Sequence, residues 1–512
     1  MSKIKQFLQT SDFFKQYKTF ALFLFYSFLV FSPFLTGRQR VHDSYAIELY
    51  AGYGRMIRAL FAQGRVLSSW FYRVLLALEA PYTLTMAVSV GASLVFLSLA
   101  AYLVFFMVRK YNGGAEKSVY ILAALGGLML VFNLFIAESM LFFENAIMSF
   151  GILMAVVAAK FALDGHIKGY AISFFCMVLS VFSYQATTAF FPPLVALFLG
   201  AIVTTRDETE RAAGFKAFWL AVLRLVKKAL PAVAIYVIAL LLHFVFLRNI
   251  AGDDGRFYGE TRIWENIRRS DQAFRGFAQD QFGFMPAYIF SGFLVVFLLF
   301  LLFYTLRKKQ DIALLASLVS FGLIFVATFL ILLPMATDDW YILPRSGVAM
   351  AGIGGLILVS ISLFSKRVSR VLVCIAALFV LLISQRQIDI QLNSHANNQL
   401  DMHELAMMGE RLRAFEDYHD ITIDRIYFGY DCPKIWFRPH LNNYHDLTIS
   451  MWHVDWMAEP LLRYYLGRDI SVTRMSDADM ARIGPAREAH WITGGRMVFD
   501  GDVVYLILNN IR

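Results

Sequence analysis

Cysteine and charged residues are both scarce in this sequence of 512 residues. Of its three cysteines, Cys176 and Cys374 lie inside apolar runs and Cys432 stands alone, which excludes a disulfide framework and a metal site of paired thiolates. Asp, Glu, Lys and Arg together make up 17% of the chain, below the roughly 25% of an average soluble domain. The composition therefore excludes an ordinary soluble globular protein.

The sequence also lacks the short motifs of common soluble enzymes. No dinucleotide-binding glycine pattern, P-loop, zinc motif or nucleophile elbow is present. The interiors of the apolar segments are nearly free of charge, with Lys160 and His243 near segment ends. Channels and transporters carry charged residues in such positions, so the pattern disfavours both classes.

Apolar sequence is abundant: 58% of the residues are hydrophobic and 49 are phenylalanine. Because a helix needs about 20 apolar residues to cross the hydrocarbon core, we predict an all-α polytopic membrane bundle of about eleven transmembrane helices. The predicted helices cover residues 19–35, 84–108, 119–136, 147–163, 170–184, 188–203, 230–247, 287–306, 312–333, 347–364 and 371–384. The fifth and sixth form one apolar stretch, broken only near Tyr184-Gln185 and Pro192-Pro193.

Basic residues indicate sidedness, because Lys and Arg accumulate in cytoplasmic loops. They occupy the N-terminus and every second loop: Lys3, Lys5, Lys15, Lys18, Arg109, Lys110, Lys117, Lys168, Arg206, Arg211, Lys216, Arg224, Lys227, Lys228, Arg307, Lys308, Lys309, Lys366, Arg367 and Arg370. No small-residue cleavage site follows the first apolar run, so we expect a retained helix in the bacterial inner membrane. The N-terminus is then cytoplasmic, and an odd helix count puts the C-terminus outside, whereas an even count would put it inside. The net charge of +9 is explained by these loops and indicates no nucleic-acid partner.

The outward side consists of loops and a terminal domain. Residues 1–384 form the predicted membrane domain, with outer loops at 36–83, 137–146, 248–286 and 334–346. Residues 385–512 form a predicted small α/β extracytoplasmic domain. Its patterns predict helices at 400–417 and 476–483, a strand at 422–430 and a hairpin at 497–508.

The first outer loop is too long for a simple connection. From Ser44 to Phe61 its apolar residues recur at helical spacing, while Arg55 and Arg58 lie toward another face. This pattern predicts an amphipathic helix in the membrane interface. Asp43 directly precedes that helix, where a carboxylate is either a cap or a functional group.

Acidic and arginine side chains gather in the outer loops, which favours chemistry at the outer interface. A carboxylate there would take a proton from an acceptor hydroxyl, and arginines would hold a lipid phosphate and stabilise it as a leaving group. The candidate catalytic residues are Asp43, Glu138 and Glu144, the candidate phosphate ligands are Arg55, Arg58, Arg65 and Arg345, and the candidate substrate-lining residues are Tyr45, Trp70, Tyr184, Gln185, Asp338 and Asp339.

Each candidate also has a simpler interpretation. Interfacial arginines bind lipid headgroups without catalysis, paired acids such as Asp338-Asp339 form solvated turns, and Tyr184-Gln185 could be polar packing between helices. No cofactor or metal ligand is assigned, and a requirement for a divalent cation is left open.

Four short motifs carry a resemblance: His42-Asp43-Ser44, Gly54-Arg55, Gly64-Arg65 ahead of Trp70, and Ser183-Tyr184-Gln185. With the overall architecture, they resemble the GT-C superfamily of polytopic glycosyltransferases, and more narrowly the Gtr-type O-antigen glucosyltransferases. The resemblance implies a polyprenyl-phosphate hexose as donor, often glucose, and a surface polysaccharide or lipid-linked glycan as acceptor. Family members often pair two acids at the first site. Here Ser44 follows Asp43, so a second acid would come from Glu48, Glu138 or Glu144.

Three other functions fit parts of the pattern. A lipid-linked-glycan polymerase or ligase shares the apolar spans and long outer loops. A flippase needs a polar path, for which the spans hold few charges. A scaffold of an envelope assembly complex would tolerate substitution around Asp43.

Overall fold

The structure is a computed structural model. It describes residues 11–36, 53–207, 215–249, 262–307, 310–331, 333, 344–430, 458–468, 470–476, 478–479, 483, 490–492 and 495–508. The chain divides into two compact units, one of Met1–Leu35 with Ile57–Ile388 and one of Thr36–Met56 with Asp389–Arg512.

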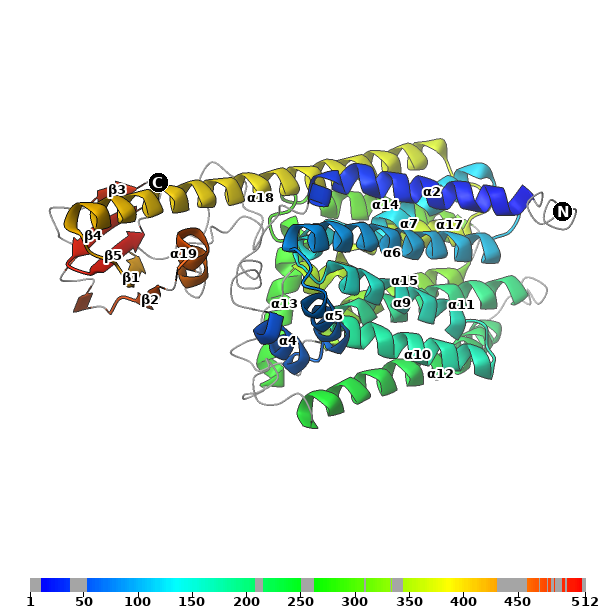
Figure 1. Cartoon of the computed structure of the whole chain (residues 1–512). Coiled ribbons are helices and arrows are strands. Elements are labelled where there is room, and N and C mark those ends of the chain that lie inside the picture. Colours follow the sequence, from blue (N-terminus) through cyan, green and yellow to red (C-terminus); the bar gives the residue numbers. More distant parts are fainter. Residues whose placement is uncertain are drawn as a thin grey trace, which may run out of the picture. The chain divides into compact units, whose positions relative to one another are not determined.

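The first unit is a bundle of helices, many of which run side by side (Figure 1). Its helices are α2 (Ser11–Phe31), η1 (Ser32–Thr36), α4 (Tyr53–Ala62), α5 (Val66–Ala77), α6 (Tyr82–Tyr111), α7 (Lys117–Val131), α8 (Ile136–Leu141), α9 (Asn145–Ala162), α10 (Ile167–Ser183), η2 (Gln185–Phe190), α11 (Phe191–Asp207), α12 (Phe215–Asn249), α13 (Ile263–Asp280), α14 (Ile289–Arg307), α15 (Asp311–Leu330), η3 (Pro344–Gly347), α16 (Val348–Ala351), α17 (Ile353–Phe364) and α18 (Arg370–His419). Thr36 and the first turn of α4 belong to the second unit, and α18 contributes to both.

Within the described part of the chain, nine helices are long and apolar enough to cross a membrane. Each of the eleven predicted spans contains a helix, and the two that fall short are α7 and α10, with 15 and 17 residues. Helices α12 and α14 carry exposed apolar side chains such as Leu241 and Val295, as expected of lipid-facing surfaces. The chain is a multi-pass membrane protein.

The predicted break between the fifth and sixth spans is present. Helix α10 ends at Ser183, Tyr184 is extended, and the chain continues as η2. The two prolines do not break the next helix, because Pro192 and Pro193 fall in the first turn of α11. There the missing backbone N–H groups have no helical partner to lose.

Two of the outer loops contain helices that the sequence patterns did not predict. Helix α5 follows α4 in the first loop, and α13 lies in the third. Both lie, with α4, at one end of the bundle, where α13 runs across the direction of the long helices (Figure 1). The predicted helix from Ser44 to Phe61 corresponds in its second half to α4, and its first half lies outside the described residues.

The short loop predicted at 137–146 is not a surface turn. Every residue from Val131 to Ala146 is buried, α8 included. Aromatic rings cover it on two sides: Phe277, Phe282 and Phe284 pack on Phe135, while Tyr72 and Tyr82 pack on Phe143. Any charged group in this segment must therefore find a partner inside the protein.

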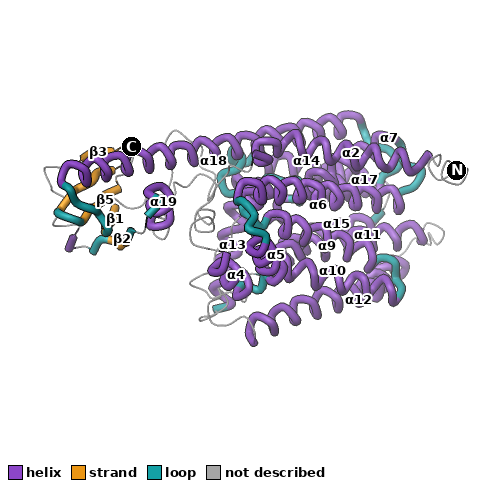
Figure 2. Tube along the Cα trace, in the orientation of Figure 1, coloured by secondary structure: helices purple, strands orange, loops and turns teal. Residues whose placement is uncertain are grey.

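The second unit contains every strand that the structure describes (Figure 2). The strands β1 (Arg425–Tyr430), β2 (Ser471–Arg474), β3 (His490–Ile492), β4 (Gly495–Asp500) and β5 (Val503–Leu508) form a sheet in the order β2-β1-β5-β4-β3. Alternate residues on β1 and β5, such as Ile426 and Val504, pack with Leu405 and Leu412 of α18 and with α19 (Ala458–Leu466). This alternation is the period-two pattern of a strand.

The predicted strand at 422–430 corresponds to β1, and the predicted hairpin at 497–508 corresponds to the antiparallel pair β4–β5. The last predicted span and the predicted helix at 400–417 belong to one continuous helix, α18. Four of the eight residues of the helix predicted at 476–483 lie outside the described residues, and Ala478, Asp479 and Ile483 are helical.

Glycines bring α7 and α17 into backbone contact. A Cβ atom on Gly355 would lie 2.1 Å from the backbone nitrogen of Leu130, and one on Gly352 would lie 2.4 Å from its carbonyl oxygen. Small residues at such crossings allow the close packing that drives helix association in membranes. All of α17 is buried, so this contact lies in the middle of the bundle.

Gly355→Ala is expected to lower the thermal unfolding midpoint in detergent, because overpacking a tight interface costs about 1–3 kcal/mol. Gly91→Ala is the matched control, since a Cβ there meets nothing within 4 Å and alanine favours a helix. Equal midpoints for the two variants would contradict the packing argument.

Candidate active site

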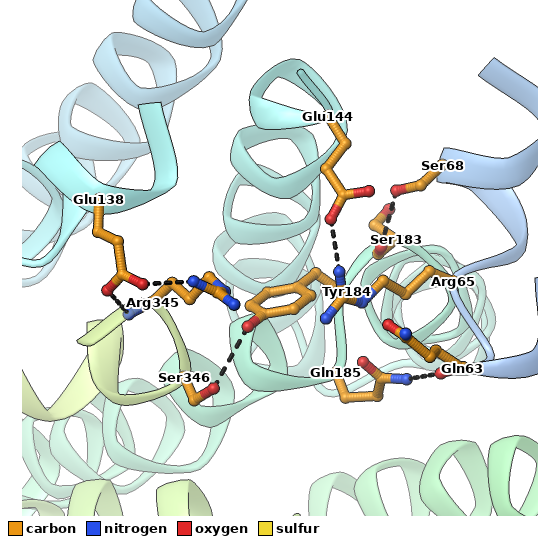
Figure 3. Close-up of polar contacts among 10 residues, drawn as sticks. All are labelled: Gln63, Arg65, Ser68, Glu138, Glu144, Ser183, Tyr184, Gln185, Arg345 and Ser346. Carbon is orange, nitrogen blue, oxygen red and sulfur yellow. Dashed lines mark hydrogen bonds and ion pairs between the residues drawn. The ribbon is translucent and has the colours of Figure 1, made fainter. Parts of the chain in front are cut away.

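The buried segment between α7 and α9 carries two glutamates, and each is paired with an arginine from a distant part of the chain. Glu138 lies in α8 and Glu144 at the N-cap of α9. Figure 3 shows the two pairs on either side of Tyr184. All of these residues belong to the first unit.

Glu138 holds Arg345 through both carboxylate oxygens. Oε1 accepts a hydrogen bond from Nη1 at 2.5 Å, and Oε2 accepts one from the backbone nitrogen of Arg345 at 2.9 Å. The glutamate is fully buried and the arginine is 8% exposed. The guanidinium also lies 4.2 Å from the centre of the Phe142 ring. The 3₁₀ turn of η3 and the orientation of its arginine are thus fixed together.

Glu144 holds Arg65 in the second pair. Nη1 of Arg65 donates to Oε1 of Glu144 at 2.5 Å, and the two side chains are 14% and 5% exposed. The guanidinium lies over the Tyr184 ring, 4.6 Å from its centre. Among the described residues none accepts a hydrogen bond from Nε of Arg65, although that atom is buried. The cation therefore keeps a donor for a further acceptor.

Tyr184 connects the two pairs. Its extended backbone at the end of α10 places the ring under Arg65, and its hydroxyl lies 3.3 Å from the hydroxyl of Ser346, the neighbour of Arg345. The break in the fifth and sixth spans therefore has a structural role, because a continuous helix would not present this side chain at the break (Figure 3).

Helix α5 is held against the same break. The hydroxyl of Ser68 donates to the Ser183 carbonyl at 3.4 Å, and Gln185 donates through Nε2 to the Gln63 carbonyl at 2.5 Å. These contacts fix the segment that carries Arg65. Gln63, Ser68 and Ser346 are not among the predicted site residues, and the sequence signals them only through their position close to residues that are.

The structure brings together five of the predicted site residues: Arg65, Glu138, Glu144, Tyr184 and Arg345. Gln185 lies beside them and contacts the chain before Arg65.

The other predicted residues are not part of this arrangement as described. Arg58 and Trp70 are exposed side chains of α4 and α5. Arg55 lies in α4, and its side chain is outside the described part. Asp43, Tyr45, Asp338 and Asp339 also lie outside the described residues.

The arrangement is suited to binding an anion. Two guanidinium groups are held in place by carboxylates that are themselves buried, so the arginines need no reorganisation when a ligand arrives. Arginine matches phosphate geometry through its planar fork of donors. Across the described ranges no three His, Cys, Asp or Glu residues lie close enough to hold a metal ion.

Fold and site together define a multi-pass membrane protein with two Glu–Arg ion pairs at buried helix ends. Residues 32–348 match the family model of the glucosyl transferase GtrII, which is more than half of the chain. The chain therefore belongs to this glucosyltransferase family, and its activity is glycosyl transfer from a sugar donor to a glycan acceptor. No curated protein sequence and no solved structure matches the chain.

Glu138→Gln is expected to destabilise the protein strongly. Removing one partner of a buried ion pair leaves an uncompensated charge, which costs about 3–5 kcal/mol. The comparison is Asp271→Asn, which breaks the exposed pair between Asp271 and Arg275 and should cost under about 1 kcal/mol. Thermal unfolding in detergent measures both variants, and a similar loss in the two would show that the Glu138 pair is not buried as described.

Proposed function

We propose that this protein transfers a hexose, glucose in view of its family, from a polyprenyl-phosphate carrier to a surface polysaccharide or lipid-linked glycan. In this proposal Arg65 and Arg345 bind the donor phosphate and stabilise it as it leaves the anomeric carbon. The observation that carries the proposal is the pair of buried glutamates that hold these arginines on either side of Tyr184.

The geometry divides the predicted roles among the acids. Both oxygens of Glu138 are engaged by Arg345, and the residue is fully buried, so it positions a cation and does not meet an acceptor hydroxyl. Glu144 is engaged with Arg65 through Oε1, and its side chain is 5% exposed. We therefore assign the general base to Asp43, the candidate catalytic residue of the first outer loop, which lies outside the described residues.

A lipid-linked donor suits the surroundings of the site. The two arginines lie at the ends of apolar helices, so a phosphate bound between them would remain attached to a polyprenyl chain in the membrane. A monophosphate sugar also needs no metal for its leaving group where two guanidinium groups supply the positive charge.

The proposal places the site on the outer face of the bacterial inner membrane. The basic residues of the predicted inside loops support this orientation through the positive-inside rule. Arg65, the Glu138–Glu144 segment and Arg345 all fall in predicted outer loops, so a single face would hold the whole site.

The test is transfer of labelled hexose from synthetic polyprenyl-phosphate glucose to endogenous surface glycan in membrane vesicles. Arg65→Gln and Arg345→Gln, each assayed as protein that remains folded, are each expected to lower kcat/KM about 100-fold, the effect of removing one preorganised donor from a developing anion. Arg275→Gln is the control, because Arg275 is an exposed arginine of α13 in the same unit.

Asp43→Asn is expected to lower transfer about 100-fold, the size of a lost general base. Transfer that survives in the folded variant would return the base to Glu144 or to Asp338 and Asp339. No transfer from this donor by the wild type, with transfer from a lipid-pyrophosphate glycan instead, would replace the proposal with a polymerase or ligase.

A further inference from the structure

A second buried contact connects α12 to the turn between α4 and α5. His243 is 5% exposed, and its Nε2 lies 3.3 Å from the Gly64 carbonyl oxygen and 3.2 Å from Nε2 of Gln185. Gln185 in turn donates to the carbonyl of Gln63. Two side chains from different helices thus hold two consecutive carbonyl groups of one turn.

The turn fits closely against His243. Gly64 has φ +75°, a left-handed conformation that favours glycine. A Cβ atom at this position would lie 2.3 Å from Nε2 of His243 and 2.9 Å from a methyl carbon of Leu247. The backbone approaches the imidazole as closely as it does only because glycine has no side chain.

The next residue after this turn is Arg65, which precedes α5 as its N-cap. No side-chain cap fixes the start of α5, so the direction in which Arg65 leaves the backbone depends on the turn before it. Its guanidinium then ends on Glu144 and over Tyr184. The polar contacts at Gln63, drawn in Figure 3, and at Gly64 therefore fix the backbone from which the Arg65 side chain extends.

Either neutral form of the imidazole makes a bond here. With the proton on Nε2, His243 donates to the Gly64 carbonyl, and with the proton on Nδ1, its Nε2 accepts from the second N–H of Gln185. Phe182 packs edge-on against the ring at 5.3 Å between centres, which restricts its rotation. The imidazole is thereby held against the turn rather than available to a substrate.

We infer that His243 and Gln185 are positioning residues: they hold the Gln63-Gly64 turn so that Arg65 is preset to receive the phosphate of the donor. This inference rests on the proposed function, since it concerns the same phosphate. It changes the role of Gln185 from a substrate-lining residue to a support for Arg65, and it adds a histidine that the sequence patterns did not connect with the site.

The experiment measures binding of polyprenyl monophosphate, without sugar, to the full-length protein in nanodiscs. His243→Leu is expected to weaken the Kd about tenfold, because a displaced Arg65 would lose roughly one charge-assisted hydrogen bond to the phosphate. His243→Gln, whose amide can donate to the Gly64 carbonyl, is expected to restore it to within about twofold of wild type. Tyr236→Phe is the matched control, because Tyr236 is a buried polar residue two turns away on the same helix.

A double-mutant cycle separates positioning through Arg65 from a general loss of packing. If His243 acts through Arg65, His243→Leu has no further effect on the Kd in an Arg65→Gln background. A full tenfold effect in both backgrounds would overturn the inference, as would a wild-type Kd for a folded His243→Leu variant. If Arg65→Gln weakens binding while His243→Leu does not, the proposed function stands and the inference fails. If the wild type does not bind the lipid phosphate, both fail.

Discussion

A guanidinium inside an apolar bundle must be matched by a carboxylate, because the cost of removing either charge from water is several kcal/mol and is offset only by close pairing. Arg345 and Glu138 meet this requirement with two hydrogen bonds, one of which comes from the backbone of the arginine. The rest of the site depends on that pair. It satisfies the charge of Glu138 inside the buried segment from Val131 to Ala146, and it fixes η3 beside Tyr184.

The same requirement decides what the acids do in the proposed reaction. A carboxylate that pairs with a buried arginine neutralises its charge and does not act as a base on a substrate. The arginines that it holds are then oriented before the donor binds, which is the condition under which charge stabilises a leaving phosphate most effectively. In this scheme the base is Asp43, a different acid from the two that hold the arginines.

The membrane bundle could be predicted from the sequence because the bilayer imposes a length and a polarity on each helix. The break at Tyr184 could be predicted for a similar reason, since polar residues interrupt a long apolar run.

The ion pairs could not be predicted from the sequence. Glu138 and Arg345 are 207 positions apart, and nothing local to either residue specifies the other. The sequence did place all of the acids and arginines concerned among the candidates, because charge next to an apolar span is rare. Nothing in the sequence connects His243 with the site, since its contact with Gly64 depends on the close approach of α12 to a turn 179 positions earlier. Helices α5 and α13 were missed because they lie inside loops whose boundaries were set by the spans on either side.

The residues matched by the family model include both partners of each ion pair in the site. The match begins at residue 32, ahead of Arg65, and ends at residue 348, three positions after Arg345. The pairs that connect Arg65 to Glu144 and Arg345 to Glu138 therefore both fall inside it, as do Tyr184 and His243. Helix α17 lies outside the match, yet it is fully buried against α7, which leads directly into the buried segment that carries both glutamates. The site is thus assembled from the matched region but held in place by a helix beyond it, so the close glycine contact between α7 and α17 supports the same ion pairs on which the proposed chemistry depends.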